Sequence, residues 1–68
     1  APPLLAIIME KIAALNAQGI TFLIIEHNMD LVMKLCRPVM VMAAGRKLLE
    51  GPPEDVARDP RVVEAYLG

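Results

Sequence analysis

The sequence has one cysteine, one histidine, one phenylalanine, one tyrosine and no tryptophan. Because Cys36 is alone, no disulfide can form within the chain, and no Cys-x-x-Cys pair or His/Cys cluster indicates a zinc site. Small domains usually need such a crosslink, a metal or a partner chain to make up for a small core. A stable structure must therefore come from packing alone, within this chain or against other protein.

An excess of either charge is also missing. The seven lysine and arginine residues nearly balance the eight aspartate and glutamate residues, for a formal net charge of −1. No basic stripe suggests nucleic acid, and no apolar run approaches the roughly 18 residues that would indicate a membrane span. The first residues lack the basic start of a signal peptide. We therefore expect no nucleic-acid partner and no membrane-spanning helix.

Apolar residues are what the sequence has in abundance. They make up 56% of the 68 residues, against about 45–50% in typical soluble domains. A domain of this size buries only about 60% of the surface that its unfolded chain exposes. The chain has too little polar surface to cover its apolar faces, so we expect it to be part of something larger.

Hydrophobic periodicity predicts helices and strands in the order α-β-α-β-β-α-α, which is α/β wiring. Residues 20–25 are almost wholly apolar, as in a strand of a parallel sheet that is covered on both faces. Asn28 can cap the helix that follows, and Gly19 can end the helix before the strand. Two parallel strands cannot form such a sheet, so we expect it to continue elsewhere. The remaining predicted elements are a strand at 39–42, its antiparallel partner at 47–51, and two short helices that start near Pro52 and Asp59.

His27 follows the predicted strand 20–25 directly. A lone histidine at a strand end is most often a structural residue that helps to cap the next helix. In open α/β sheets, however, ligands bind outside the carboxyl ends of the strands. A neutral imidazole at such an edge can donate one hydrogen bond to a phosphate oxygen and accept another. The residues alone leave both interpretations open.

The other candidate residues favour structural roles. Glu26 is typical of the first solvated residue after a buried strand, and Cys36 of a small core residue. The sequence contains no GxxxxGK[ST] phosphate loop and no metal-ligand spacing. We therefore expect no metal site, and nothing in this chain could cradle a nucleotide by itself.

Two motifs together resemble the C-terminal end of ATP-binding cassette (ABC) transporter ATPase subunits, most of all those of branched-chain amino acid importers. One is "ITFLIIEHNM", which is similar to the strand and switch-histidine loop of these ATPases, and the other is the terminal "RDPRVVEAYLG". The resemblance spans essentially the whole chain. It implies the C-terminal fragment of a P-loop nucleotide-binding domain, with a helix after the D-loop (1–19), the strand, switch-histidine loop and helix (20–36), a strand and hairpin (38–51) and a C-terminal helical extension (52–68).

The resemblance assigns a catalytic role to one residue. His27 matches the switch histidine, which in this family contacts the γ-phosphate and helps to position the attacking water. Glu26 does not inherit the family's catalytic glutamate, which lies upstream in the Walker B motif. The Walker A, Q-loop, signature and Walker B residues match nothing in this chain. Arg37-Pro38 departs from the Asp-Arg pair of many relatives, so a salt bridge at this position is not predicted.

The resemblance also implies a function. The chain would be a fragment of the ATPase subunit of an ABC importer, whose parent couples ATP hydrolysis to the uptake of branched-chain or related amino acids. ATP and Mg would bind the parent, and we expect this fragment alone to bind neither and to be inactive. The implied partners are the rest of the ATPase domain, the transmembrane permease subunits and a second ATPase subunit. The implied location is the cytoplasmic face of the inner membrane, as a peripheral protein.

Two alternatives remain at this point. The lipopolysaccharide-export ATPase also has a similar "YLG" at its end, and a small interaction module without enzymatic activity is compatible with the length of the chain. In either case the apolar faces need cover, because large exposed apolar patches are rare on stable monomers. We therefore expect the isolated fragment to form a homo-oligomer. The candidates for its contact are Leu5, Ile8, Ile12, Phe22 and Ile24.

Overall fold

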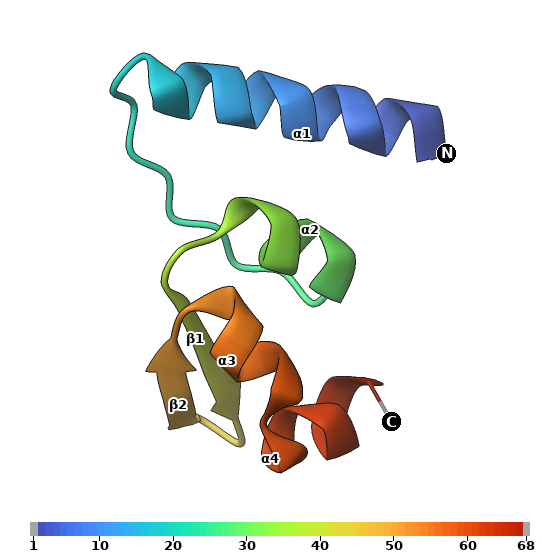
Figure 1. Ribbon diagram of the computed structural model, residues 1–68, viewed down its shortest axis with the longest axis vertical. Helices are drawn as coiled ribbons and strands as arrows, with labels where there is room; N and C mark the ends of the chain where they lie inside the picture. The colour runs from blue at the N-terminus through green and yellow to red at the C-terminus, as the bar shows by residue number, and fades with distance from the viewer. Residues whose placement is uncertain (1, 68) are drawn as a thin grey trace.

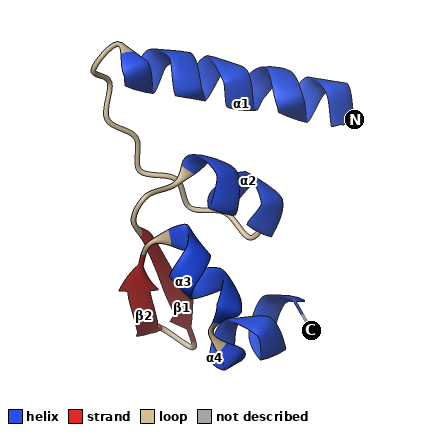
Figure 2. Cartoon of the chain, in the orientation of Figure 1, coloured by secondary structure: helices blue, strands red, loops and turns tan. Residues whose placement is uncertain are grey.

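A computed structural model describes residues 2–67. Ala1 and Gly68, the first and last residues of the predicted segments 1–19 and 52–68, lie outside the described residues. Helix α1 (Pro2–Ala17) lies above helix α2 (Met29–Leu35), and α2 lies above a β-hairpin of β1 (Val39–Ala43) and β2 (Arg46–Gly51) (Figure 1). Helices α3 (Pro53–Arg58) and α4 (Pro60–Val62) pack beside the hairpin, and the chain continues into a π-helix (Val63–Leu67). Figure 2 shows that an irregular segment separates the first two helices.

Helix α1 confirms the helix predicted at the start of the chain. Prolines are tolerated in its first turn because the backbone N–H groups there have no partner within the helix. At the other end Gly19 has a φ of +99°, which only glycine adopts easily, and the chain turns away. The side-chain amide of Asn16 donates a 2.9 Å hydrogen bond to the carbonyl oxygen of Ile20 and fixes this exit.

The predicted strand at residues 20–25 is wrong for this structure. Residues 20–28 form an extended segment without regular hydrogen bonding, and 89% of the surface of both Leu23 and Ile25 is exposed. A strand needs a neighbour with which to share hydrogen bonds, and the only sheet formed by residues 2–67 is the pair β1–β2. The order α-β-α-β-β-α-α and the parallel sheet are thus corrected: these residues form helices and one antiparallel hairpin.

The hairpin itself was predicted correctly. Its register runs from Val39 opposite Gly51 to Ala43 opposite Arg46, with a bulge between Val41 and Met42. Ala44 and Gly45 form the turn, with φ values of 51° and 74°. Two successive residues with positive φ suit a two-residue hairpin, because their backbone twist matches that of the flanking strands.

A small core lies between α2, one face of the hairpin, and helices α3 and α4. Val39 and Val41 on β1 point into it, whereas Met40 and Met42 on the opposite face are exposed. This alternation is the two-residue period of a strand with one buried face. The residues of this core cluster, of which Val56 and Val62 have no exposed surface, are Leu31, Val32, Val39, Val41, Val56 and Val62.

The C-terminal segment of residues 52–67 also follows its predicted helices. Pro53 starts α3, Glu54 and Asp55 occupy its first turn, and Arg58 lies in its last; this distribution of charge suits the helix dipole. Asp59 then caps α4 by accepting a 2.9 Å hydrogen bond from the backbone N–H of Arg61. The α-helical part ends at Val62, and the residues after it are π-helical.

Candidate functional site

Glu26, His27 and Asn28 form a short loop between the extended segment and helix α2. One carboxylate oxygen of Glu26 accepts hydrogen bonds from the backbone N–H of His27 (2.9 Å) and of Asn28 (3.3 Å). The side chain of Asn28 accepts a bond from the backbone N–H of Leu31 (3.2 Å) and caps the helix as predicted. The backbone of His27 is therefore held from both sides.

The imidazole of His27 lies beside the Glu26 carboxylate and is open to solvent. Its side chain is 94% exposed, and its Nε2 atom lies 3.6 Å from the nearest carboxylate oxygen of Glu26, too far for a hydrogen bond. The backbone N–H of His27, and then that of Asn28, stabilise the Glu26 carboxylate and lower its pKa. A fixed backbone with an exposed imidazole is an arrangement that can offer a hydrogen bond to a group outside this chain.

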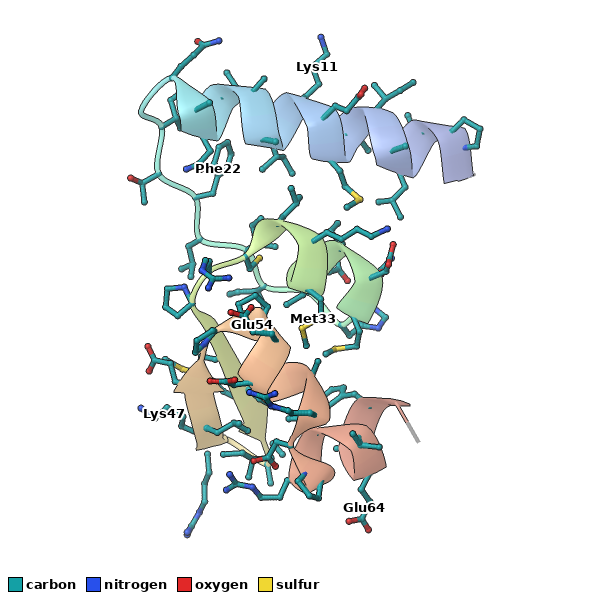
Figure 3. The ribbon with its side chains drawn as sticks, in the orientation of Figure 1. Lys11, Phe22, Met33, Lys47, Glu54 and Glu64 are labelled. Atoms are coloured by element: carbon teal, nitrogen blue, oxygen red, sulfur yellow. The ribbon has the colours of Figure 1, made fainter. Side chains whose placement is uncertain are left out.

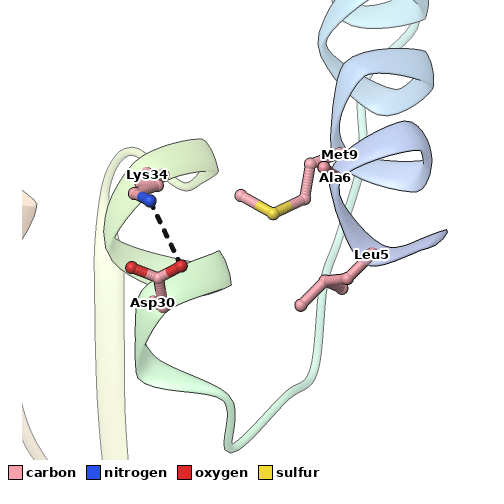
Figure 4. A pocket seen from close by; sticks show the side chains of 5 residues that line it. All are labelled: Leu5, Ala6, Met9, Asp30 and Lys34. Carbon is pink, nitrogen blue, oxygen red and sulfur yellow. Dashed lines mark hydrogen bonds and ion pairs between the residues drawn. The ribbon is translucent and has the colours of Figure 1, made fainter. Parts of the chain in front are cut away.

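Helix α2 carries the loop and is buried on one side. Leu31 and Val32 lie in the core, whereas Asp30 and Lys34 form an exposed ion pair at 3.2 Å. This pair borders a pocket of about 310 Å³ between α2 and α1. Figure 4 shows Leu5 and Met9 on the other side of it. Helix α1 therefore approaches α2 beside a charged pair, and much of its own apolar surface stays exposed.

A groove of about 990 Å³ lies beside the extended segment. Its walls come from the second half of α1, from residues 21–26, from α2 and the residues after it, and from β1. The side chains in it are mainly apolar, and Phe22 lies on the extended segment below the C-terminal half of α1 (Figure 3). The predicted strand at residues 20–25 and strand β1 thus both contribute to the lining of one groove. They do not pair with each other in a sheet.

An ion pair joins Arg37, which lies two residues after the end of α2, to helix α3. The two terminal guanidinium nitrogens of Arg37 donate to the two carboxylate oxygens of Glu54, at 3.1 and 2.8 Å. Figure 3 shows Glu54 at the end of α3 nearest to α2. The hydrogen bond from Arg37 lowers the pKa of Glu54, and the pKa of Arg37 is raised in return. The sequence did not predict this pair.

Cys36 behaves as the sequence predicted. It is half-buried and packs against the core. Burial raises the pKa of its thiol, which disfavours the reactive thiolate. Among residues 2–67 no three His, Cys, Asp or Glu side chains gather as metal ligands would, and no helix in that range has the length and apolar character that crossing a membrane requires.

Comparison with known proteins finds similarity to one class of transport protein. A family profile described as branched-chain amino acid ATP-binding cassette transporter matches residues 46–68. The probable branched-chain amino acid transport ATP-binding protein LivG of Archaeoglobus fulgidus is 43% identical over 60 residues, which are 88% of this chain and 23% of that protein. No solved structure matches the chain significantly.

Further relatives have the same description. The LivG protein of Methanocaldococcus jannaschii, described in the same words, is 43% identical over 72 residues, covering all of this chain and 28% of that protein. The high-affinity branched-chain amino acid transport ATP-binding protein LivG of Salmonella typhimurium is 43% identical over 60 residues, 87% of this chain and 24% of that protein. The chain is therefore homologous to the C-terminal part of branched-chain amino acid transport ATP-binding proteins of ABC transporters. It spans about a quarter of the length of these relatives.

Proposed function

We propose that this chain is the C-terminal part of the ATP-hydrolysing subunit of an importer for branched-chain or related amino acids, and that His27 is its one catalytic residue. The observation that carries the proposal is the exposed imidazole on a loop held by Glu26 and Asn28, in a chain homologous to ATP-binding proteins. In this role His27 donates a hydrogen bond to the γ-phosphate of ATP and helps to hold the attacking water.

The rest of the site lies outside this chain. Phosphoryl transfer depends on positioning and on charge stabilisation, so a single donor is useful only beside a phosphate-binding loop and Mg²⁺. The sequence has no such loop, and residues 2–67 hold no cluster suited to the metal. Glu26 is occupied by its bonds to the backbone, which supports a structural role for it rather than that of the catalytic base.

The groove is where the rest of the domain would pack. Residues 21–25 and 39–42 both line it, mainly with apolar side chains, and do not pair in a sheet. A strand from the remaining part of the domain would bury those side chains and supply the hydrogen-bond neighbour that residues 20–25 need. We therefore propose the following assignment of segments within the complete ATPase domain. Residues 1–19 form the helix after the D-loop, and residues 20–36 form a strand, the switch-histidine loop and a helix. Residues 38–51 form a strand and hairpin, and residues 52–68 form the helical extension.

The proposal includes partners and a location. An ATPase subunit of an importer works with transmembrane permease subunits and a second ATPase subunit, so it would lie at the cytoplasmic face of the membrane as a peripheral protein. All eight of the relatives considered are branched-chain amino acid transport proteins, which favours this function over lipopolysaccharide export and over a module without enzymatic activity.

The test is the ATPase activity of the full-length protein that contains this sequence. Because the bond from His27 strengthens in the transition state, His27→Ala should lower kcat by on the order of 10²–10³, with little change in nucleotide affinity. Lys11→Ala is the control, since it removes an exposed charge on α1 and leaves the bonds of the His27 loop intact. Unchanged turnover in His27→Ala would return His27 to a structural role.

A further inference from the structure

We propose that the Arg37–Glu54 ion pair is a positioning contact through which the C-terminal segment 52–67 fixes the orientation of helix α2 and, with it, of His27. The inference rests on the proposed function of His27. Neither residue touches nucleotide in this scheme. Each acts through the helix that carries the histidine loop.

The contact is built to fix an orientation. Both oxygens of Glu54 are engaged by separate nitrogens of Arg37, at 3.1 and 2.8 Å, across 17 positions of sequence. A two-point contact between a planar guanidinium and a carboxylate sets an angle as well as a distance. Arg37 directly follows Cys36, the residue that caps the end of α2.

The apolar contact between α2 and α3 holds the two helices together but does little to fix the orientation of α2. Leu31 and Val32 of α2 share the core with Val56 of α3, which has no exposed surface. Burial of apolar surface is non-directional, and the valine and leucine contacts would tolerate a small rotation of α2. The ion pair near the end of the helix, although both side chains are exposed, restricts that rotation.

Geometry makes such a rotation matter for His27. The helix has seven residues, which is about 10 Å of length, so a tilt of about 10° around its C-terminal end moves its start by roughly 2 Å. His27 lies two residues before that start. A misplacement of about 1 Å can cost on the order of 10² in rate.

The experiment measures ATPase kinetics of the full-length protein with R37E, E54R, E54Q and the double variant R37E/E54R, next to His27→Ala. Exposed ion pairs contribute little, so we expect each single variant to lower kcat by about two- to fivefold, with the KM for ATP unchanged. The double variant restores the pair with its charges exchanged and should recover most of kcat. K47E, which breaks the exposed pair between Lys47 and Glu50 within the hairpin, is the matched control and should have no effect.

The outcomes separate this inference from the proposed function. If His27→Ala abolishes turnover while R37E and E54R keep full kcat, or if the double variant is no better than the single ones, the positioning role is overturned. A lower melting temperature with unchanged kcat would also overturn it, because that pattern belongs to a merely structural contact. If His27→Ala has no effect, the proposed function fails and this inference fails with it.

Discussion

The hydroxyl of Tyr66 donates a 2.7 Å hydrogen bond to the backbone carbonyl of Met42, 24 residues earlier in the chain. Met42 lies opposite the bulge of β2, and Tyr66 lies in the terminal π-helix. The pair Arg37–Glu54 lies at the other end of the C-terminal segment, and between them the guanidinium of Arg61 donates a 3.0 Å bond to the carbonyl of Leu48, so the segment is held at three points. Both Tyr66 and Met42 also line the groove, so this segment contributes to a surface formed mainly by earlier residues.

Tyr66→Phe should loosen the end of this segment. The change removes one hydrogen bond and little apolar volume, and because Tyr66 is 42% exposed, water can replace part of the bond. The free energy of unfolding should fall by about 0.5–1 kcal/mol. Urea denaturation with an unchanged slope would measure this as a lower midpoint. Glu64→Gln on the same π-helix, where the side chain points outward (Figure 3), is the control and should be neutral.

Stability should fall in acid because three carboxylates have lowered pKa values in the folded chain. The hydrogen bond from Arg37 lowers the pKa of Glu54, and that from Arg61 lowers the pKa of Asp59. The backbone N–H of His27 lowers the pKa of Glu26. Each group binds protons less readily folded than unfolded, so its contribution is complete above the unfolded pKa, near 4. The contribution is lost as the pH falls through the lower folded values.

Thermal unfolding between pH 7 and pH 2 would test this pH dependence. The melting temperature should stay level above about pH 5 and fall below about pH 4. Arg37→Gln removes the partner that lowers the pKa of Glu54, so this variant should lose less stability over the acid range. A melting temperature that does not change down to pH 2 would contradict the prediction, and 1 M salt should reduce the effect because these groups are exposed.

The local elements could be predicted from the sequence because their causes are local. The Asn28 cap, the turn at Ala44-Gly45 and the proline that starts α3 all depend on residues within a few positions of one another. The strand predicted at residues 20–25 is wrong for this structure, because its apolar pattern fits a sheet with neighbouring strands that residues 2–67 do not supply. The same residues therefore appear as an exposed extended segment.

The sequence predicted the place of His27 between an apolar run and a helix capped by Asn28, but not the contacts made by Glu26 and Arg37. The place of His27 after an apolar run pointed to the loop. That Glu26 accepts two backbone bonds depends on how the loop turns, and Arg37 meets Glu54 only after the hairpin has reversed the chain. The sequence signal for the bonds to Glu26 was an acidic residue close to a helix cap. No pattern in the sequence indicated the pair of Arg37 and Glu54.

The isolated 68-residue chain should show no saturable binding of Mg-ATP in the micromolar range. One imidazole is its only proposed phosphate contact, and the sequence lacks the glycine-rich loop whose backbone N–H groups hold phosphates. Isothermal titration calorimetry with Mg-ATP would measure the binding, and the full-length protein would serve as the positive control. Saturable micromolar binding by the short chain would show that other residues form a phosphate site.

The isolated chain should also associate with itself, since its groove and extended segment expose apolar side chains. Of the predicted contact residues, Ile8 and Phe22 are exposed, whereas Leu5, Ile12 and Ile24 are half-buried. Leu23 and Ile25, each 89% exposed, join them as stronger candidates. A closed dimer that covers this surface is the simplest arrangement that removes it from water.

Analytical ultracentrifugation at micromolar concentration should therefore detect a dimer or a larger species. Replacing Leu23 and Ile25 together by aspartate should shift the chain toward the monomer, because charges would then have to be buried in the contact. Lys11→Asp is the control, as Lys11 points away from the rest of the molecule on the outer side of α1 (Figure 3). A folded monomer that persists at all concentrations would mean that the short chain covers these side chains itself, by a rearrangement of α1 over the groove.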